Sequence, residues 1–491
     1  MRILMLGWEF PPFVAGGLGT ACHGLTKALD RAGHDVTFVL PRKLDRSRQA
    51  AAPMRVVGVG DALPVDGRAG PDDARAPAGG DGLGQGELGP GGRAISIPGF
   101  DRTEFVAIDS GFASPYPGGH AGGVGAGFGA DAAGGSGMMQ PIPMSALEAP
   151  HELEALRGAG VSGDKLAEGD PSAWQGAPEH GYGEDVVGDT ERYARMVVGM
   201  CRGRNFDVVH AHDWMTIPAG LAAAKVLDRP LVVHVHATEF DRSGDHVDQR
   251  VYDIERRGLH LADRVVCVSE YTKSICTGRY DAPAHKIDVV YNGVEAEVDD
   301  GHREFKVKQG DHVVLFLGRI TMQKGPEYFV RAAKRVLEKV EDVKFVIAGS
   351  GDMAKRIVEE AAFLGIGHRV LFTGFLRGSD VDRAYRMADC YVMPSVSEPF
   401  GIAPLEAMRN DVPVIISKQS GVSEVLTHAL KIDFWDIDEM ANKIVAVLKH
   451  APLSQTLRQN QPHELKGLTW DASARNVVAS YGAAIAEARI G

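Results

Sequence analysis

Residues 390–407 read CYVMPSVSEPFGIAPLEA, and this stretch decides the fold class. Its first part, 390–393, is a short apolar run that predicts a strand buried on both faces. A loop follows, and Gly401 marks the N-terminus of the next helix. A buried strand, a loop and a helix form the repeating unit of a parallel α/β sheet.

The same unit recurs along most of the chain. Short runs rich in β-branched residues alternate with helical patterns such as 326–341, which starts with a proline suited to a first helical position. The alternation predicts an α/β protein with two doubly wound parallel sheets. The other predicted strands are 2–6, 35–40, 206–211, 230–236, 264–268, 312–317, 343–348, 369–373 and 412–416.

The chain divides near residue 300. Apolar periodicity is lost over 295–306, where the sequence becomes charged, so we expect an N-terminal domain over 1–300 and a C-terminal domain over 301–470. A last helical pattern over 471–488 follows the second sheet. We expect this terminal segment, 471–491, to pack back on the N-terminal domain.

A glycine-rich insertion, about residues 60–180, interrupts the first domain. Residues 111–137 contain 11 glycines in 27 positions, and 66–92 have almost no large apolar side chains. Both stretches are expected to be mobile loops, because they can bury too little surface to offset their ordering entropy. A weakly apolar island between them, from Ala94 to Ile108, predicts a pair of strands.

Composition and charge exclude several classes of protein. The net charge is −12, with 53 basic and 65 acidic residues, which argues against nucleic-acid binding. No apolar run approaches the roughly 18 residues that span a bilayer, so no integral membrane contact is expected. Five scattered cysteines without a CxxC pair argue against a zinc ribbon or a disulfide framework. The opening apolar run is too short for a signal peptide, and we expect a reduced, cytoplasmic protein.

Glycines follow two of the predicted strands. Gly16-Gly17 lies between strand 2–6 and a helix over about 18–32, where backbone N–H groups can bind an anion. A glycine pair needed only for a tight turn is the alternative. Gly351 lies on a similar loop, which either faces a nucleotide or caps its helix through Asp352.

Two cations lie on one loop of the second sheet. Gly318-Arg319 ends a predicted strand, and Lys324 comes just before the next helix. Ligands of open parallel sheets bind at the carboxyl ends of the strands, so these two side chains can converge on a diphosphate. The alternative is a solvated basic loop.

Two carboxylates flank the helix start in the opening stretch. Glu398 ends the loop, and Glu406 lies about a turn and a half into the helix. The N–H groups between them can bind a phosphate or sugar oxygen while each glutamate accepts from hydroxyls. Alanine and leucine surround Glu406, so a solvated helix face explains it poorly.

Two His-x-His pairs, His210/His212 and His234/His236, end neighbouring strands. Alternate residues share one strand face, so a four-histidine metal site is conceivable. No nearby cysteine or carboxylate completes it, and we favour a polar, sugar-facing site.

Two Asp-x-Asp pairs, at 380–382 and 436–438, are also compatible with a divalent metal. Both precede predicted helices, so we interpret Asp380 and Asp436 as N-cap residues. We therefore expect neither a metal nor a cofactor.

Taken together, the motifs resemble the retaining family 4 glycosyltransferases of GT-B type, in the glycogen and starch synthase-like group. The resemblance covers nearly all of the chain apart from the insertion. It implies two Rossmann-like domains that face a cleft, with the sugar-nucleotide donor bound mainly by the C-terminal one. It is carried by Glu9-Phe10-Pro11-Pro12, Gly16-Gly17-Leu18, His210-Ala211-His212-Asp213-Trp214, Val233-His234-Val235-His236, Val268-Ser269, Asn292-Gly293-Val294, Gly318-Arg319, Lys324-Gly325, and Glu398 with Glu406.

The resemblance implies roles for individual residues. Arg319 and Lys324 match the pair that holds the diphosphate, and Glu398 matches the glutamate at the donor sugar. Glu406 matches the glutamate at the ribose. The implied catalytic residues are His236, Arg319, Lys324 and Glu398; the implied donor-binding residues are Gly16, Gly17, Asn292, Gly318, Gly351, Phe400, Gly401, Ile402 and Glu406; His212 and Asp213 lie on the acceptor side.

The implied reaction is transfer of a hexose, glucose first, from ADP- or UDP-glucose to an α-glucan. One departure is Val14, which stands where glycogen and starch synthases usually carry a lysine, so the donor nucleotide stays open. A hexosyltransferase for a lipid, glycan or small-molecule acceptor and a non-catalytic sugar-nucleotide-binding protein are the alternatives. The insertion is either functionally silent or serves the acceptor side.

Overall fold

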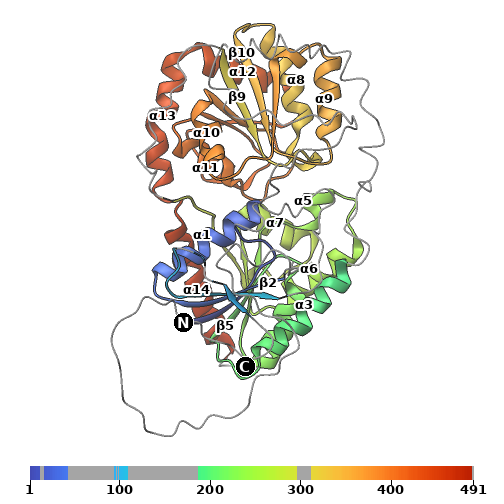
Figure 1. Ribbon diagram of the computed structural model, residues 1–491, viewed down its shortest axis with the longest axis vertical. Helices are drawn as coiled ribbons and strands as arrows, with labels where there is room; N and C mark the ends of the chain where they lie inside the picture. The colour runs from blue at the N-terminus through green and yellow to red at the C-terminus, as the bar shows by residue number, and fades with distance from the viewer. Residues whose placement is uncertain are drawn as a thin grey trace, which may run out of the picture.

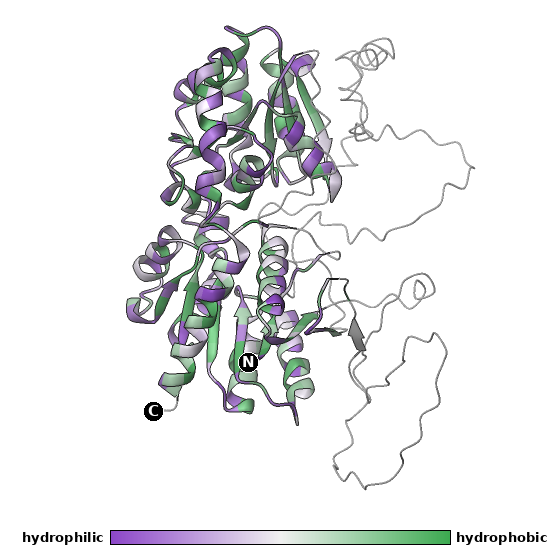
Figure 2. Cartoon of the chain, turned by 90° about the vertical axis from the view of Figure 1, so that its left-hand side faces the viewer, coloured by the Kyte–Doolittle hydropathy of each residue, from purple (hydrophilic) through white to green (hydrophobic). Residues whose placement is uncertain are grey.

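Two α/β domains lie one above the other in the computed structural model (Figure 1). Each has a central sheet with helices on both faces, and hydrophobic residues concentrate on the strands and the inward helix faces (Figure 2). Within the described part of the chain, no helix is both long and apolar enough to cross a membrane. The described residues are 1–11, 16–41, 93–95, 97, 99–108, 186–295 and 311–488.

The sheet of the N-terminal domain has the order β3-β4-β2-β1-β5-β6-β7-β8. All neighbours pair in parallel except β3, which is antiparallel to β4. The chain order reverses direction between β1 and β5, which makes their carboxyl ends the switch point where ligands bind in such sheets. The strands are β1 (Arg2–Leu6), β2 (Asp35–Pro41), β3 (Arg93–Ile95), β4 (Thr103–Ile108), β5 (Val208–His212), β6 (Leu231–Val235), β7 (Arg264–Cys267) and β8 (Ile287–Val289).

Helices cover this first sheet on both faces, which is why its strands are apolar on both sides. One core cluster joins the sheet to α1 and α14, and a second joins it to α3, α4, α6 and α7. The helices are α1 (Gly17–Arg31), α3 (Val186–Cys201), α4 (Ile217–Leu227), α5 (Glu239–Ser243), α6 (Gln249–Leu261), α7 (Glu270–Arg279) and α14 (Trp470–Ala488).

The sheet of the C-terminal domain is parallel throughout, in the order β11-β10-β9-β12-β13-β14. Its switch point lies between β9 and β12. The strands are β9 (His312–Leu317), β10 (Val343–Ala348), β11 (Val370–Gly374), β12 (Cys390–Met393), β13 (Val414–Ser417) and β14 (Leu430–Ile432), and the helices are α8 (Pro326–Leu337), α9 (Ala354–Phe363), α10 (Ser379–Met387), α11 (Ile402–Arg409), α12 (Ile437–Lys449) and α13 (Ala451–Leu465).

The terminal helix α14 lies on the N-terminal sheet although it follows the second sheet in sequence (Figure 1). It packs against α1, where a Cβ added at Gly24 would lie 2.1 Å from the Trp470 ring. A β-bridge between Val294 and Thr469 joins the two chain segments that connect the domains. The chain therefore crosses between the domains twice at one place.

The predicted fold class is confirmed, with local differences. Strands 2–6, 312–317, 343–348 and 390–393 agree to the residue, whereas β8 and β14 were missed because three-residue runs give no clear pattern. The island from Ala94 to Ile108 contains β3 and β4, and β4 extends the main sheet beside β2.

Other predictions are wrong or concern residues outside the described ranges. Asp436 caps α12 by accepting from the Glu439 N–H at 2.8 Å, but Asp380 is not an N-cap, because Gly378 occupies that position before α10. Asp352 does not cap α9, whose N-cap is Met353. Several predictions concern residues outside the described ranges: the glycine-rich stretches 66–92 and 111–137, Val14, and most of the predicted boundary over 295–306. The domain limits therefore stay predictions.

Candidate functional site

The carboxyl ends of the two sheets meet through direct contacts between loops. The Ser269 hydroxyl, after β7, donates to the Pro399 carbonyl at 2.5 Å, and the Ser397 hydroxyl donates to the Asp241 carboxylate at 2.6 Å. The Glu424 carboxylate accepts from the first N–H groups of α7, at 2.6 and 3.0 Å. The predicted site residues lie around this junction.

The loop after β9 carries Arg319 and is fixed by the glycine loop after β10. The Ile320 N–H donates to the Ser350 carbonyl at 2.9 Å. A Cβ at Gly349 would lie 1.8 Å from the Gly318 oxygen, and one at Gly351 would lie 2.2 Å from the Ile320 oxygen. Only glycines allow this approach, and the Arg319 side chain above it is exposed to solvent.

Lys324 and Glu398 form an ion pair across the C-terminal switch point. The Glu398 side chain is buried and also accepts from the Ser395 hydroxyl at 3.2 Å. Gly325 adopts a left-handed conformation, φ 63°, and a Cβ there would lie 2.2 Å from the Pro394 oxygen. This glycine lets the lysine loop lie directly against the loop that leads to Glu398.

The start of α11 combines an open helix end with contacts to both domains. Gly401 is its N-cap at φ 103°, in the region that favours glycine. Ile402 packs against core clusters of both domains, and the buried Phe400 ring lies 6.0 Å from that of Tyr291. Glu406 accepts from a tyrosine hydroxyl of α10 at 3.0 Å, and its burial raises its pKa.

On the N-terminal side, α1 begins at a pair of glycines. Gly16 is the N-cap, and a Cβ at Gly17 would meet no described atom within 4 Å. The buried carboxylate of Glu9 lies behind Gly16, 2.7 Å from the position of an added Cβ. Burial raises the pKa of Glu9, while the positive charge of Arg319 from the other domain lowers it. Glu9 is a part of the site that we did not predict.

Asp213 holds the segment after β6 in place. It adopts a left-handed conformation, φ 58°, and its carboxylate accepts from the His236 N–H at 2.6 Å and the Ala237 N–H at 3.3 Å. Burial raises the pKa of Asp213 to about 7. Asn292 is likewise buried, in the loop after β8.

The four histidines of the two strand ends form one stack. His212 Nδ1 lies 2.8 Å from His236 Nε2, and His210 Nε2 lies 3.2 Å from His234 Nδ1. Burial lowers the pKa of all four, to about 3 for His236, so the imidazoles are neutral at pH 7. The prediction of a polar, sugar-facing site is wrong for His210, His212 and His234, because these three side chains are buried. Only His236 of the four histidines is partly exposed.

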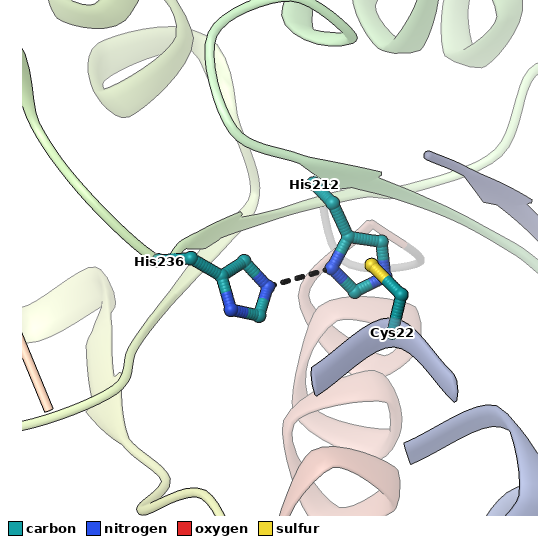
Figure 3. A group of neighbouring side chains, drawn as sticks. All are labelled: Cys22, His212 and His236. Atoms are coloured by element: carbon teal, nitrogen blue, oxygen red, sulfur yellow. Dashed lines mark hydrogen bonds between the residues drawn. The ribbon is translucent and has the colours of Figure 1, made fainter. Parts of the chain in front are cut away.

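The stack has neighbours that the sequence pattern did not show. The Tyr481 hydroxyl of α14 lies 2.6 Å from His210 Nδ1. Cys22 of α1 lies beside His212 and His236, and one ligand atom of each falls within 4.8 Å of the others (Figure 3). The expectation that no cysteine stands near the histidines is therefore wrong, since the fold brings Cys22 there from far along the chain.

Comparison with known proteins places this geometry in a family. Residues 2–66 match "Starch synthase catalytic domain", 184–298 match "Glycosyltransferase Family 4", and 298–464 match "Glycosyl transferases group 1". An uncharacterized glycosyltransferase of Methanocaldococcus jannaschii is 32% identical over 294 residues, which are 56% of this chain and 75% of that protein.

Two further relatives extend over most of the chain. Glycogen synthase of Mycobacterium tuberculosis is 25% identical over 438 residues, 87% of this chain and 80% of that protein. The structure of sucrose-phosphate synthase from Thermosynechococcus elongatus aligns with a TM-score of 0.65 and 18% identity, covering 99% of both chains, which shows the shared fold. The chain therefore belongs to the family 4 glycosyltransferases of GT-B type, in the group that is similar to glycogen and starch synthases.

Proposed function

We propose that this glycosyltransferase moves a hexose, glucose first, from ADP- or UDP-glucose to an α-glucan, with retention of the anomeric configuration. The observation that carries the proposal is the Lys324–Glu398 pair beside Arg319 at the C-terminal switch point. These groups place positive charge and a sugar-binding carboxylate next to each other. The glycogen synthase that aligns over 87% of the chain supports the glucan acceptor.

The donor diphosphate is assigned to the glycine loops and the two cations. Arg319 presents a two-pronged donor, and Lys324 presents a point charge that the diphosphate shares with Glu398. Gly16 and Gly17 belong to the N-terminal domain, and their N–H groups bind the phosphates from that side of the site. Gly318 and Gly351 shape the floor of this subsite.

The sugar and nucleoside are assigned to the loop before α11 and to the histidine stack. Glu398 accepts from sugar hydroxyls, the neutral His236 accepts from or donates to them, and Glu406 accepts from the ribose. His212 is fully buried and contacts the His236 ring, and the Asp213 carboxylate accepts from the His236 N–H. Both residues, which the resemblance places on the acceptor side, therefore position His236 between the acceptor and the donor sugar. We assign the remaining donor contacts to Asn292, Phe400, Gly401 and Ile402.

The reaction breaks the bond from C1 to the phosphate oxygen and forms a bond from C1 to the acceptor oxygen on the same face. The acceptor proton passes to the departing phosphate. Arg319 and Lys324 oppose the charge that develops on this phosphate, which preorganised cations do without a metal ion. We therefore propose a metal-independent reaction. We also propose that the protein works in the cytoplasm.

An acceptor other than a glucan is the second candidate. It is favoured by Val14, because the missing lysine separates this chain from the glycogen and starch synthases. A screen of purified protein with ADP-, UDP- and GDP-sugars, with and without glycogen, distinguishes the two. Nucleotide release from ADP- or UDP-glucose that rises with glycogen is expected. Release that glycogen does not stimulate would favour the second candidate, and no release with any donor would contradict both.

A further inference from the structure

Cys22, His212 and His236 form a cluster that the transfer reaction does not use as a unit. They come from α1, the end of β5 and the residue after β6 (Figure 3). One ligand atom from each lies within 4.8 Å of the other two, and the two imidazoles already meet nitrogen to nitrogen at 2.8 Å. A thiolate and neutral imidazoles are the preferred ligands of Zn²⁺ and of the similar ion Co²⁺.

The surroundings of the cluster favour a dication. His212 Nε2 and His236 Nδ1 are buried and have no hydrogen-bond partner among the described residues. A buried nitrogen without a partner is costly, and a bound cation would give such a nitrogen a partner.

The cluster has one side from which an ion can enter. Cys22 and His212 are fully buried, whereas His236 is partly exposed. Five residues after His236, Asp241 contacts Ser397 of the other domain, so the segment that carries His236 leads to the junction of the two domains.

We propose that Cys22, His212 and His236 bind a divalent cation of the Zn²⁺ class, with the Cys22 sulfur as thiolate. The ion replaces the thiol proton, which is released to solvent. Because the ion occupies His236, it inhibits transfer instead of supporting it. This consequence rests on the proposed function, whereas the binding itself does not.

The test is a Co²⁺ titration of the full-length, metal-free protein, followed by absorption spectroscopy. We expect a thiolate-to-cobalt charge-transfer band and the visible bands of tetrahedral Co²⁺, both displaced by Zn²⁺. C22S should lose the charge-transfer band. The matched control is C276S, since Cys276 is also a buried thiol, with its sulfur 3.8 Å from that of Cys267, and it lies outside the cluster. C276S should keep the band.

A wild-type protein without the band would overturn the proposal, and so would a band that survives in C22S or vanishes in C276S. Thermal melts of each variant show whether it is folded, and H236N provides an independent test with an expected loss of Co²⁺ affinity of about tenfold or more. Zn²⁺ should also lower donor turnover in the wild type and not in C22S. Cobalt binding without this inhibition would keep the ion site and contradict the placement of His236 at the donor.

Discussion

The two walls of the site differ in charge and in how the chain builds them. The C-terminal wall carries Arg319, Lys324 and Glu398, ionised groups on loops that directly follow β9 and β12. The N-terminal wall carries buried neutral imidazoles and carboxylates whose pKa values are raised. Under the proposed function, this difference implies a division of labour: the C-terminal domain opposes the charge of the leaving phosphate, and the N-terminal domain orients hydroxyl groups without adding charge.

The largest expected effect breaks the charged wall. Lys324→Ala should lower kcat/KM by 100-fold or more, because losing a contact to a developing phosphate charge costs on the order of 3 kcal/mol. Steady-state kinetics with the preferred donor measure it. Lys418→Ala is the matched control, since Lys418 belongs to the same domain and pairs with Asp433 on the surface.

Lys324→Ala also leaves Glu398 with Ser395 as its remaining side-chain partner among the described contacts, so some loss of melting temperature is expected. The loss in kcat/KM should be far larger than the loss in stability. Unchanged turnover would remove Lys324 from the site.

A smaller effect is expected at the neutral wall. His236→Ala removes a hydrogen bond between uncharged groups, which is worth about 1 kcal/mol, so kcat/KM should fall about fivefold. His285→Ala, an exposed histidine of the same domain, should leave it unchanged. A loss as large as that of Lys324→Ala would mean that the two walls do not differ as proposed.

The C-terminal wall was predictable because its residues act within short motifs. Gly318-Arg319 and Lys324 belong to the loop between β9 and α8, and Glu398 and Gly401 belong to the loop between β12 and α11. The pairing of Lys324 with Glu398 follows from the adjacency of β9 and β12, which sequence order does not show.

The N-terminal wall was harder to predict. Its contacts join α1, β5 and α14. The residues involved, Cys22, His212 and Tyr481, lie far apart in the sequence. Their proximity depends on the order of the sheet and on the return of α14, and no local pattern specifies either. Glu9 was missed for a similar reason, since its neighbour Arg319 belongs to the other domain.

Glu255, a buried carboxyl group of α6 near Asp213, predicts a pH effect on stability. Burial raises the pKa of Glu255 to about 7, although the charge of Arg242 and a hydrogen bond from the Tyr280 hydroxyl act to lower it. The folded protein therefore holds a proton that the unfolded chain releases above about pH 4.3. The resulting stability is present below that pH and is lost as the pH rises to about 7.

Thermal melts between pH 5 and pH 7 test this effect. The wild type should lose melting temperature relative to E255Q, which has no titratable group at this position. A difference between the two proteins that stays constant across this range would show that Glu255 is ionised in the folded state throughout.

The central claim is that fixed cations of the C-terminal wall, and not a metal ion, carry the charge of the leaving group. The most direct test is donor turnover in excess EDTA, with NMR of the anomeric proton of the product. We predict full activity, or a gain if an inhibitory ion is removed, and an α-linked product from an α-linked donor. Loss of activity that Mn²⁺ or Mg²⁺ restores would contradict the claim, and a β-linked product would contradict retention.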